Sequence, residues 1–174
     1  MSSAEPPRQR RSLAELDRAT DAATCTRLAP AAEIRSRALK LLTSREHSRL
    51  ELARKLHRRG YAADAVDAVL DDLAAAGLLS EERLLGAYVA ERLQKGFGPL
   101  RIRAELQAKG LSDAAIAPHL QLDERDCLAL MTAVDEGKFG KGPPHDRQTL
   151  AKRARFLEYR GFPSSLIARV LDLD

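Results

Sequence analysis

The chain has 174 residues, of which 44% are apolar, 4% aromatic and 31% charged, with no tryptophan. Because the apolar residues are mostly Ala and Leu, and no run rich in β-branched and aromatic residues occurs, the composition favours helices and excludes a protein built on sheets. Lys and Arg outnumber Asp and Glu by 29 to 25, a net charge of +4 that mildly favours polyanionic partners.

The cysteines and the hydropathy pattern exclude further classes. Cys25 and Cys127 stand far apart without a Cys-x-x-Cys pair, so neither a zinc site nor a disulfide framework is expected. No stretch approaches the roughly 18 uncharged apolar residues of a membrane span, and no apolar region of a secretory signal follows the N-terminus. We therefore expect a cytoplasmic protein with no membrane partner.

The chain divides at about residue 33. Residues 1–33 mix Ser, Pro, Arg, Thr and Ala without a sustained helical period, which predicts a largely disordered tail. From Ile34 onward the chain is strongly periodic, and three of its segments, 51–61, 101–111 and 152–162, align with one another on a glycine. This self-similarity predicts an internal repeat.

The aligned glycines, Gly60, Gly110 and Gly161, are 50 and 51 residues apart. Apolar residues recur four residues before each glycine, directly after it and six residues after it: Leu56, Leu106 and Leu157; Tyr61, Leu111 and Phe162; Val66, Ile116 and Ile167. Each copy is therefore predicted to be a basic helix, a glycine in the left-handed conformation, a residue that folds back onto the core, and a second helix.

A further helix precedes each pair, predicted at residues 34–43, 81–94 and 124–134. Ser48 opens a capping box, and Pro99 stands in a first helical turn, where its missing N–H costs nothing. Caps and negative charge mark three other helix starts, at Ser80-Glu81, Ser112-Asp113 and Asp123-Glu124.

The predicted fold class is therefore all-α: three tandem three-helix repeats that form an elongated, curved array. The repeats are expected at residues 34–79, 80–122 and 123–174, because a single unit of this size buries too little surface to be robust alone. A Gly- and Pro-rich stretch at 137–145 predicts a hinge within the third repeat.

Positive charge gathers on the aligned helices. Between Arg35 and Arg59 nine Lys or Arg residues stand against two acids, whereas Tyr61 to Glu82 contains six acids and no base. A solvated helical face would explain any one of these residues, but their repetition predicts a positive stripe that follows a phosphate backbone or an acidic protein groove. The candidate stripe comprises Arg45, Arg49, Arg54, Lys55, Arg58, Arg59, Arg92, Lys95, Arg101, Arg103, Lys109, Lys152, Arg153, Arg155 and Arg160.

Motifs for catalysis or metal binding are missing. The four histidines show no paired-ligand spacing and are expected at the surface or at helix caps: His47, His57, His119 and His145. Adjacent carboxylates such as Asp71 and Asp72 point about 100° apart on a helix and are poorly placed to share an ion. Residues 96–99 lack the lysine and Ser/Thr of a phosphate loop and are expected to start a helix. We expect no catalytic residue, metal or cofactor.

Most aromatic residues fall at packing positions, so stacking on bases is not expected as the main binding mode. Among the aromatic residues, Phe97 and Tyr159 fit the pattern of packing positions least well.

Four strings, taken in order, carry a family resemblance: Arg-Glu-His-Ser at 45–48, Gly-Leu-Leu-Ser-Glu-Glu-Arg at 77–83, Lys-Gly-Phe-Gly-Pro at 95–99, and Phe-Leu-x-x-Arg-Gly-Phe at 156–162. From about residue 34 to 174 the chain resembles the bacterial RecX family, the regulators of the RecA recombinase. Leu84 departs from the expected Phe, and Ser80 replaces an acid. Both changes conserve packing or capping.

The resemblance implies a tandem three-helix repeat protein that binds RecA and its filament on single-stranded DNA, with double-stranded DNA as a further candidate partner. Such a protein would inhibit strand exchange and ATP hydrolysis, and so modulate recombination, DNA repair and the SOS response. It would act as a monomer without a small-molecule substrate. Two alternatives stay open from the residues: a general nucleic-acid-binding repeat without a protein target, and a hydrolytic enzyme with an unrecognised site.

Overall fold

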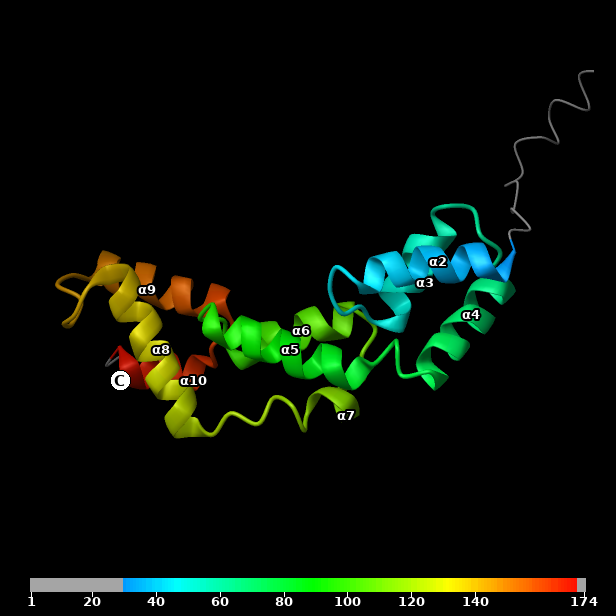
Figure 1. Ribbon diagram of the computed structural model, residues 1–174. Coiled ribbons are helices and arrows are strands. Elements are labelled where there is room, and N and C mark those ends of the chain that lie inside the picture. The colour runs from blue at the N-terminus through cyan, green and yellow to red at the C-terminus, as the bar shows by residue number, and fades with distance from the viewer. Residues whose placement is uncertain (1–29, 172–174) are drawn as a thin grey trace, which may run out of the picture.

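The computed structural model describes residues 30–171, which consist of helices and connecting loops, with no strand among them. The helices are α2 (Ala31–Leu42), α3 (Arg49–His57), α4 (Ala63–Ala75), α5 (Glu81–Gln94), α6 (Pro99–Ala108), α7 (Asp113–Ile116), α8 (Glu124–Phe139), α9 (Arg147–Arg160) and α10 (Ser164–Val170). Figure 1 shows them in an elongated, curved row, with α2, α3 and α4 at one end and α8, α9 and α10 at the other. The predicted fold class is confirmed. No helix in this span has the length and apolarity needed to cross a membrane.

Each group of three helices encloses an apolar core of its own. The leucines four residues before the repeat glycines, Leu56, Leu106 and Leu157, are all 0% exposed. The residues directly after the glycines and six residues after them are buried as well. Burying one such leucine stabilises a fold by about 1.5 to 3 kcal/mol. The core positions predicted from the repeat are therefore confirmed.

Side chains cap the helix starts as the sequence predicts. The Ser48 hydroxyl accepts a hydrogen bond from the Glu51 amide, and the Glu51 carboxylate accepts one from the Ser48 amide, which completes the capping box of α3. The caps of α5, α7 and α8 are Ser80, Ser112 and Asp123. These bonds satisfy amides that have no partner within a helix.

Two helices, α2 and α8, differ in length from the prediction, and α7, for which no bounds were predicted, is short. Helix α2 begins at Ala31, three residues before the predicted start; residues 1–29 of the predicted tail lie outside the described span. Helix α7 has only four residues, because Pro118 follows closely and lacks the N–H that a longer helix needs. Helix α8 continues to Phe139, so the predicted hinge region is partly helical. A single glycine, Gly137, lowers helix stability without breaking the helix. Hinge motion itself stays a prediction.

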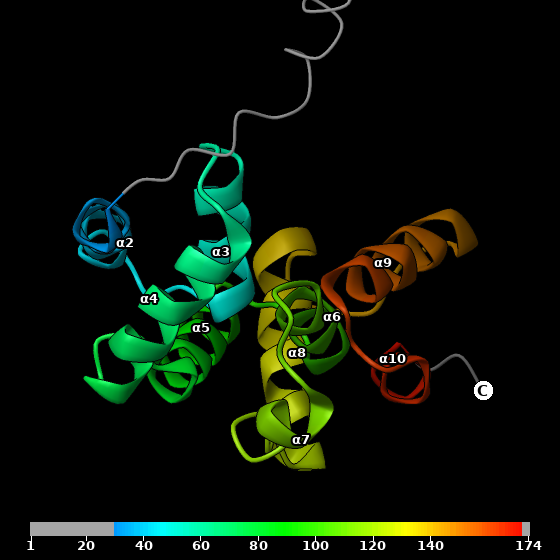
Figure 2. The same cartoon turned by 90° about the vertical axis from the view of Figure 1, so that its right-hand side faces the viewer.

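Helices α3, α6 and α9 contact one another at their ends, with α3 turned across the direction of α6 (Figures 1 and 2), and we call the three helices the basic rod. The C-terminal end of α9 contacts the N-terminal end of α6, and the C-terminal end of α6 contacts the N-terminal end of α3 (Figures 1 and 2). The chain therefore runs along the rod in the reverse of its sequence order. The repeat glycines close each rod helix, with φ of 85° at Gly60 and 88° at Gly110 and Gly161.

The junction of α9 with α6 explains the Gly-Phe-Gly-Pro string. The Gly98 amide donates to the Arg160 carbonyl (2.8 Å) and the Leu100 amide to the Gly161 carbonyl (3.0 Å), so the end of α9 satisfies the free amides of α6. A Cβ on Gly98 would lie 2.4 Å from the Gly161 oxygen, which leaves room only for glycine. Pro99, at the first helical position, has no amide to satisfy. This string starts a helix, as predicted.

Candidate nucleic-acid and partner interface

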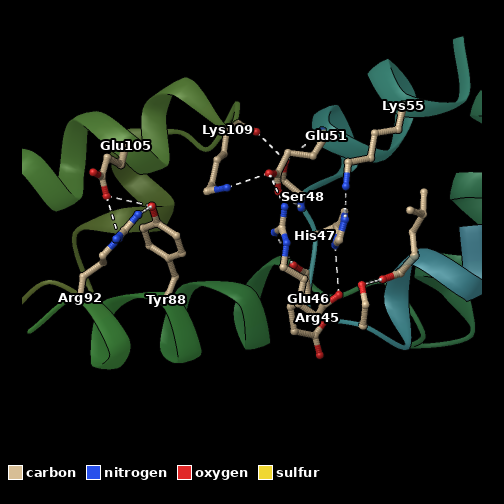
Figure 3. A network of polar contacts seen from close by, with 12 residues as sticks. Arg45, Glu46, His47, Ser48, Glu51, Lys55, Tyr88, Arg92, Glu105 and Lys109 are labelled. Carbon is tan, nitrogen blue, oxygen red and sulfur yellow. Dashed lines mark hydrogen bonds and ion pairs between the residues drawn. The ribbon is translucent and has the colours of Figure 1, made fainter. Parts of the chain in front are cut away.

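The junction of α6 with α3 is a network of polar contacts around Glu51 (Figure 3). The Ser48 hydroxyl donates to the Lys109 carbonyl (2.6 Å), while the Lys109 ammonium and the Arg45 guanidinium contact the Glu51 carboxylate at 2.7 and 3.2 Å. Partial burial acts to raise the pKa of Glu51, but hydrogen bonds from Lys109, Arg45 and the Ser48 amide outweigh it and lower the pKa to about 2. Glu51 therefore stays ionised and joins the first two repeats.

His47 lies inside this junction, where it is only 1% exposed. The Arg45 carbonyl, 3.0 Å from Nδ1, can only accept, so Nδ1 carries the hydrogen and Nε2 accepts from the Lys55 ammonium at 2.7 Å. Burial lowers the pKa of His47, and the positive charges of Arg45 and Lys55 lower it further. The prediction of a surface position is wrong for His47, which is a neutral residue that holds Lys55 in place.

A cleft of about 780 Å³ opens between α3 on one side and α5 and α6 on the other. Its lining consists of Glu51, Arg54, Lys55, His57, Arg58, Tyr88, Arg92, Glu105, Ala108 and Lys109. On the α3 wall, Arg54 and Arg58 are exposed and form no ion pair within residues 30–171. The cations of the opposite wall are paired, Arg92 with Glu105 at 2.9 Å and Lys109 with Glu51 at 2.7 Å. The α3 wall therefore carries the uncompensated charge that would attract an anionic partner.

Glu105 organises the opposite wall of the cleft. Its carboxylate forms ion pairs with Arg92 (2.9 Å) and Arg101 (3.0 Å) and accepts a hydrogen bond from the Tyr88 hydroxyl (2.8 Å). Burial raises the pKa of Tyr88, and the hydrogen bond to Glu105 raises it further, so the phenol remains a donor. Figure 3 shows Arg92, Tyr88 and Glu105 meeting across α5 and α6. The single carboxylate of Glu105 thus holds two arginines in place, and the cluster of the three side chains keeps a net positive charge.

The other predicted stripe residues separate by environment. Five are exposed and form no ion pair within residues 30–171: Arg54, Arg58, Arg59, Lys152 and Arg155. Seven form ion pairs near the surface: Arg45, Arg49, Arg92, Lys95, Arg101, Arg103 and Lys109. Lys55 contacts His47, and Arg160 donates to the Lys95 carbonyl. Their part in binding stays a prediction.

Arg153 does not belong to an exposed stripe. It is 6% exposed and forms an ion pair with the equally buried Asp135 at 3.1 Å. Its position in the repeat is that of Leu52 and Ile102, which are both fully buried. The assignment of Arg153 to the stripe is therefore wrong, because this position faces the core whatever residue fills it.

The predicted site contained only basic residues. It missed the acids and the aromatic ring that hold these cations in place. Glu51 and Glu105 form ion pairs with four of the predicted cations, and the Tyr88 hydroxyl lies between Arg92 and Glu105. The spacing of Arg101 and Glu105, four residues apart on a helix, was the available sequence signal for one of these contacts. The contact between Glu51 and Lys109 spans 58 residues and had no such signal. Within residues 30–171 there is no group of three or more potential metal ligands.

The fold and the site define a tandem helical-repeat protein whose basic helices contact one another at their ends. The chain matches the first, second and third three-helix domains of RecX at residues 35–73, 80–120 and 129–171. The chain therefore belongs to the RecX family.

Named relatives agree with this assignment, and solved structures share the fold. The chain is 44% identical over 144 residues to the regulatory protein RecX of Pseudomonas putida strain GB-1, covering 81% of this chain and 92% of that one. It is 44% identical over 134 residues to its counterpart in Halorhodospira halophila, covering 77% and 83%. The crystal structure of RecX from Lactobacillus salivarius has the same fold, with a TM-score of 0.68 at 21% identity over 83% of this chain and 97% of that one. A further crystal structure of regulatory protein RecX gives 0.71 at 19%, over 95% and 81%.

Proposed function

We propose that this protein is a regulator that binds the RecA recombinase and its filament on single-stranded DNA, and inhibits strand exchange and ATP hydrolysis. The observation that carries the proposal is membership of a family whose named relatives are regulatory proteins. The protein acts in the cytoplasm as a monomer, without a cofactor or catalytic residues, and thereby modulates recombination, DNA repair and the SOS response.

The basic rod supports this proposal because it repeats one kind of contact from one repeat to the next. Each repeat contributes one basic helix, whose end contacts the end of the next through main-chain hydrogen bonds or the Ser48 hydroxyl. A filament also presents its subunits at a fixed repeat. A rigid row of cationic helices can therefore contact several successive phosphates or acidic groups at once, and each contact raises the effective concentration of the next.

The α3 wall of the cleft is the strongest candidate for the main contact. Arg54 and Arg58 are exposed and unpaired within residues 30–171, so they lose no internal ion pair on binding an anion. Inhibition then follows from occupancy, since a protein lodged along a filament prevents a second DNA strand from entering and hinders the subunit movements coupled to ATP turnover.

The test is a titration of RecA-driven ATP hydrolysis and strand exchange on single-stranded DNA. We expect inhibition at amounts well below those that coat the DNA. The variant Arg54→Glu with Arg58→Glu should need at least about tenfold more protein, because attraction becomes repulsion at the contact. The control Arg37→Glu with Lys40→Glu makes the same change in net charge on α2 and should inhibit like the wild type. Circular dichroism confirms that each variant is helical.

Two results would point elsewhere. Inhibition only at DNA-coating amounts would favour a general nucleic-acid-binding repeat without a protein target. Metal-dependent cleavage of DNA that survives repurification, and is lost on changing one acidic residue, would favour an enzyme.

A further inference from the structure

A cluster of arginines and aromatic rings occupies the junction of α6 with α9 and shares Arg92 with the cleft on the α3 side. Three guanidinium groups lie over the ring of Phe97: Arg101 at 4.7 Å, Arg160 at 4.9 Å and Arg92 at 5.1 Å from its centroid. Cations at these distances are attracted to the face of the ring. Phe97 therefore gathers three positive charges at one point on the rod.

Tyr159, in the last turn of α9, extends this cluster to the surface. Tyr159 is 70% exposed, which is unusual for a residue with a large aromatic side chain. The Arg101 guanidinium lies 4.6 Å from the centroid of the Tyr159 ring and also donates to the Tyr159 carbonyl at 3.0 Å. One arginine thus holds both the backbone and the ring, so Tyr159 is exposed and also held in place. Leu100, 53% exposed, adds apolar surface at the same junction.

The charges around the exposed ring favour a polyanion. Arg92 and Arg101 share one carboxylate, that of Glu105. Arg160 donates to the Lys95 carbonyl and has no carboxylate partner within residues 30–171. The three arginines over Phe97 therefore carry a net positive charge beside the open face of an aromatic ring. A ligand that combines phosphates with flat aromatic groups matches both features.

We propose that Tyr159 is a stacking platform for a base of single-stranded nucleic acid, with Arg160 and Arg101 contacting the adjoining phosphates. The inference deepens the proposed function, on which it partly rests, by naming where the rod contacts the DNA strand. A duplex does not fit, because its bases are stacked on one another and offer no free face. An acidic peptide would satisfy the arginines and leave the ring unused.

A tryptophan at position 159 turns this site into its own reporter, since the chain has no other tryptophan. The full-length Tyr159→Trp protein is titrated with an oligodeoxythymidine and with an abasic oligonucleotide of the same length and charge. We expect saturable quenching of the fluorescence with the first and none with the second, because only a base can stack on the indole.

Binding measured by anisotropy of labelled oligonucleotides completes the test. Tyr159→Leu should weaken binding of oligodeoxythymidine about tenfold and binding of the abasic strand less than twofold, whereas Tyr159→Phe should bind like the wild type. Leu78→Ala is the matched control, since Leu78 is a large apolar residue, 41% exposed, in the first repeat. It should change neither affinity.

Equal quenching by the abasic strand or by an acidic peptide would overturn the stacking site, as would wild-type affinity of Tyr159→Leu for oligodeoxythymidine. RecA-driven ATP hydrolysis, measured with the same preparations, reports separately on the proposed function. If the wild type inhibits RecA while Tyr159→Leu keeps full affinity for the oligonucleotide, the stacking site fails and the proposed function stands.

Discussion

At the scale of single residues, the role of a charged side chain in this protein depends on its burial and its ion pairs as much as on its exposure to solvent. Arg153 fills a position that its repeat counterparts fill with Leu52 and Ile102, and Asp135 provides the countercharge. The pair is not fully satisfied, because Nε of Arg153 and Oδ1 of Asp135 lack hydrogen-bond partners in the described structure. Desolvation of such a pair consumes much of its attraction, so the pair is a weak source of stability.

Removing one member of this pair should therefore cost more than removing both. Arg153→Leu restores the apolar residue type of the other repeats but leaves Asp135 buried without a countercharge, and should destabilise the third repeat by about 3 kcal/mol. Adding Asp135→Ala should recover most of this loss. Urea denaturation followed by circular dichroism measures both. Arg155→Leu, on the exposed face of the same helix, is the control and should change stability by less than about 0.5 kcal/mol. A double variant as unstable as Arg153→Leu would contradict the argument.

Glu51 should make stability depend on pH in the acid range. Its pKa is about 2 in the folded protein and 4.5 in the unfolded chain, so the ionised carboxylate stabilises the fold above pH 4.5, and this stabilisation is lost as the pH falls toward 2. Glu51→Gln should cost about 1 to 2 kcal/mol at pH 7, less than the pKa shift alone implies, because water partly screens these ion pairs. The difference from the wild type should vanish near pH 2. Denaturation at pH 7, 4 and 2.5 measures it; a constant difference would rule out this origin.

At the scale of helices, the sequence predicted what local interactions decide. The cap at Ser48, the left-handed glycines and the core leucines depend on residues a few positions apart, and all are found as expected. The end-to-end contacts were not predictable in this way, since the Ser48 hydroxyl meets the Lys109 carbonyl across 61 residues. The burial of Arg153 was available from the register of the repeat, but its residue type suggested a surface position.

Two glycine substitutions can separate the effect of limited space around a glycine from the effect of its backbone conformation. Gly98 has an ordinary φ of −81°, but a Cβ there would lie 2.4 Å from the Gly161 oxygen. Gly140 has a φ of 86° and open space around it. Gly140→Ala should therefore cost about 1 to 3 kcal/mol through backbone strain alone. Gly98→Ala should cost a similar amount, about 1 to 3 kcal/mol, through steric overlap, and it alone should expose the amides at the start of α6 to hydrogen exchange. Normal protection of the Leu100 amide in Gly98→Ala would contradict the junction as described.

At the scale of the molecule, the rod makes three helices from different repeats act as one binding element. The sequence predicted an elongated array with basic helices, and Figure 1 shows that array. What it did not supply was the contacts between the rod helices, which place the C-terminal end of α9 against the N-terminal end of α6, and the C-terminal end of α6 against the N-terminal end of α3. If each repeat contributes its own cations, a polyanion should bind additively, one repeat at a time.

Salt dependence of DNA binding tests this additivity. Arg54, Arg103 and Arg155 are exposed cations on α3, α6 and α9. If each contacts one phosphate of a single strand, replacing any one with Ala should lower the slope of log K against log salt by about 0.7, and replacing all three by about 2. The effects should add, because Arg54, Arg103 and Arg155 share no ion-pair partner within residues 30–171. Arg37→Ala on α2 is the control for net charge and should leave the slope unchanged. A change confined to Arg54→Ala would place the DNA contact in the first repeat alone, and equal changes in the control would show that binding follows net charge instead of the rod.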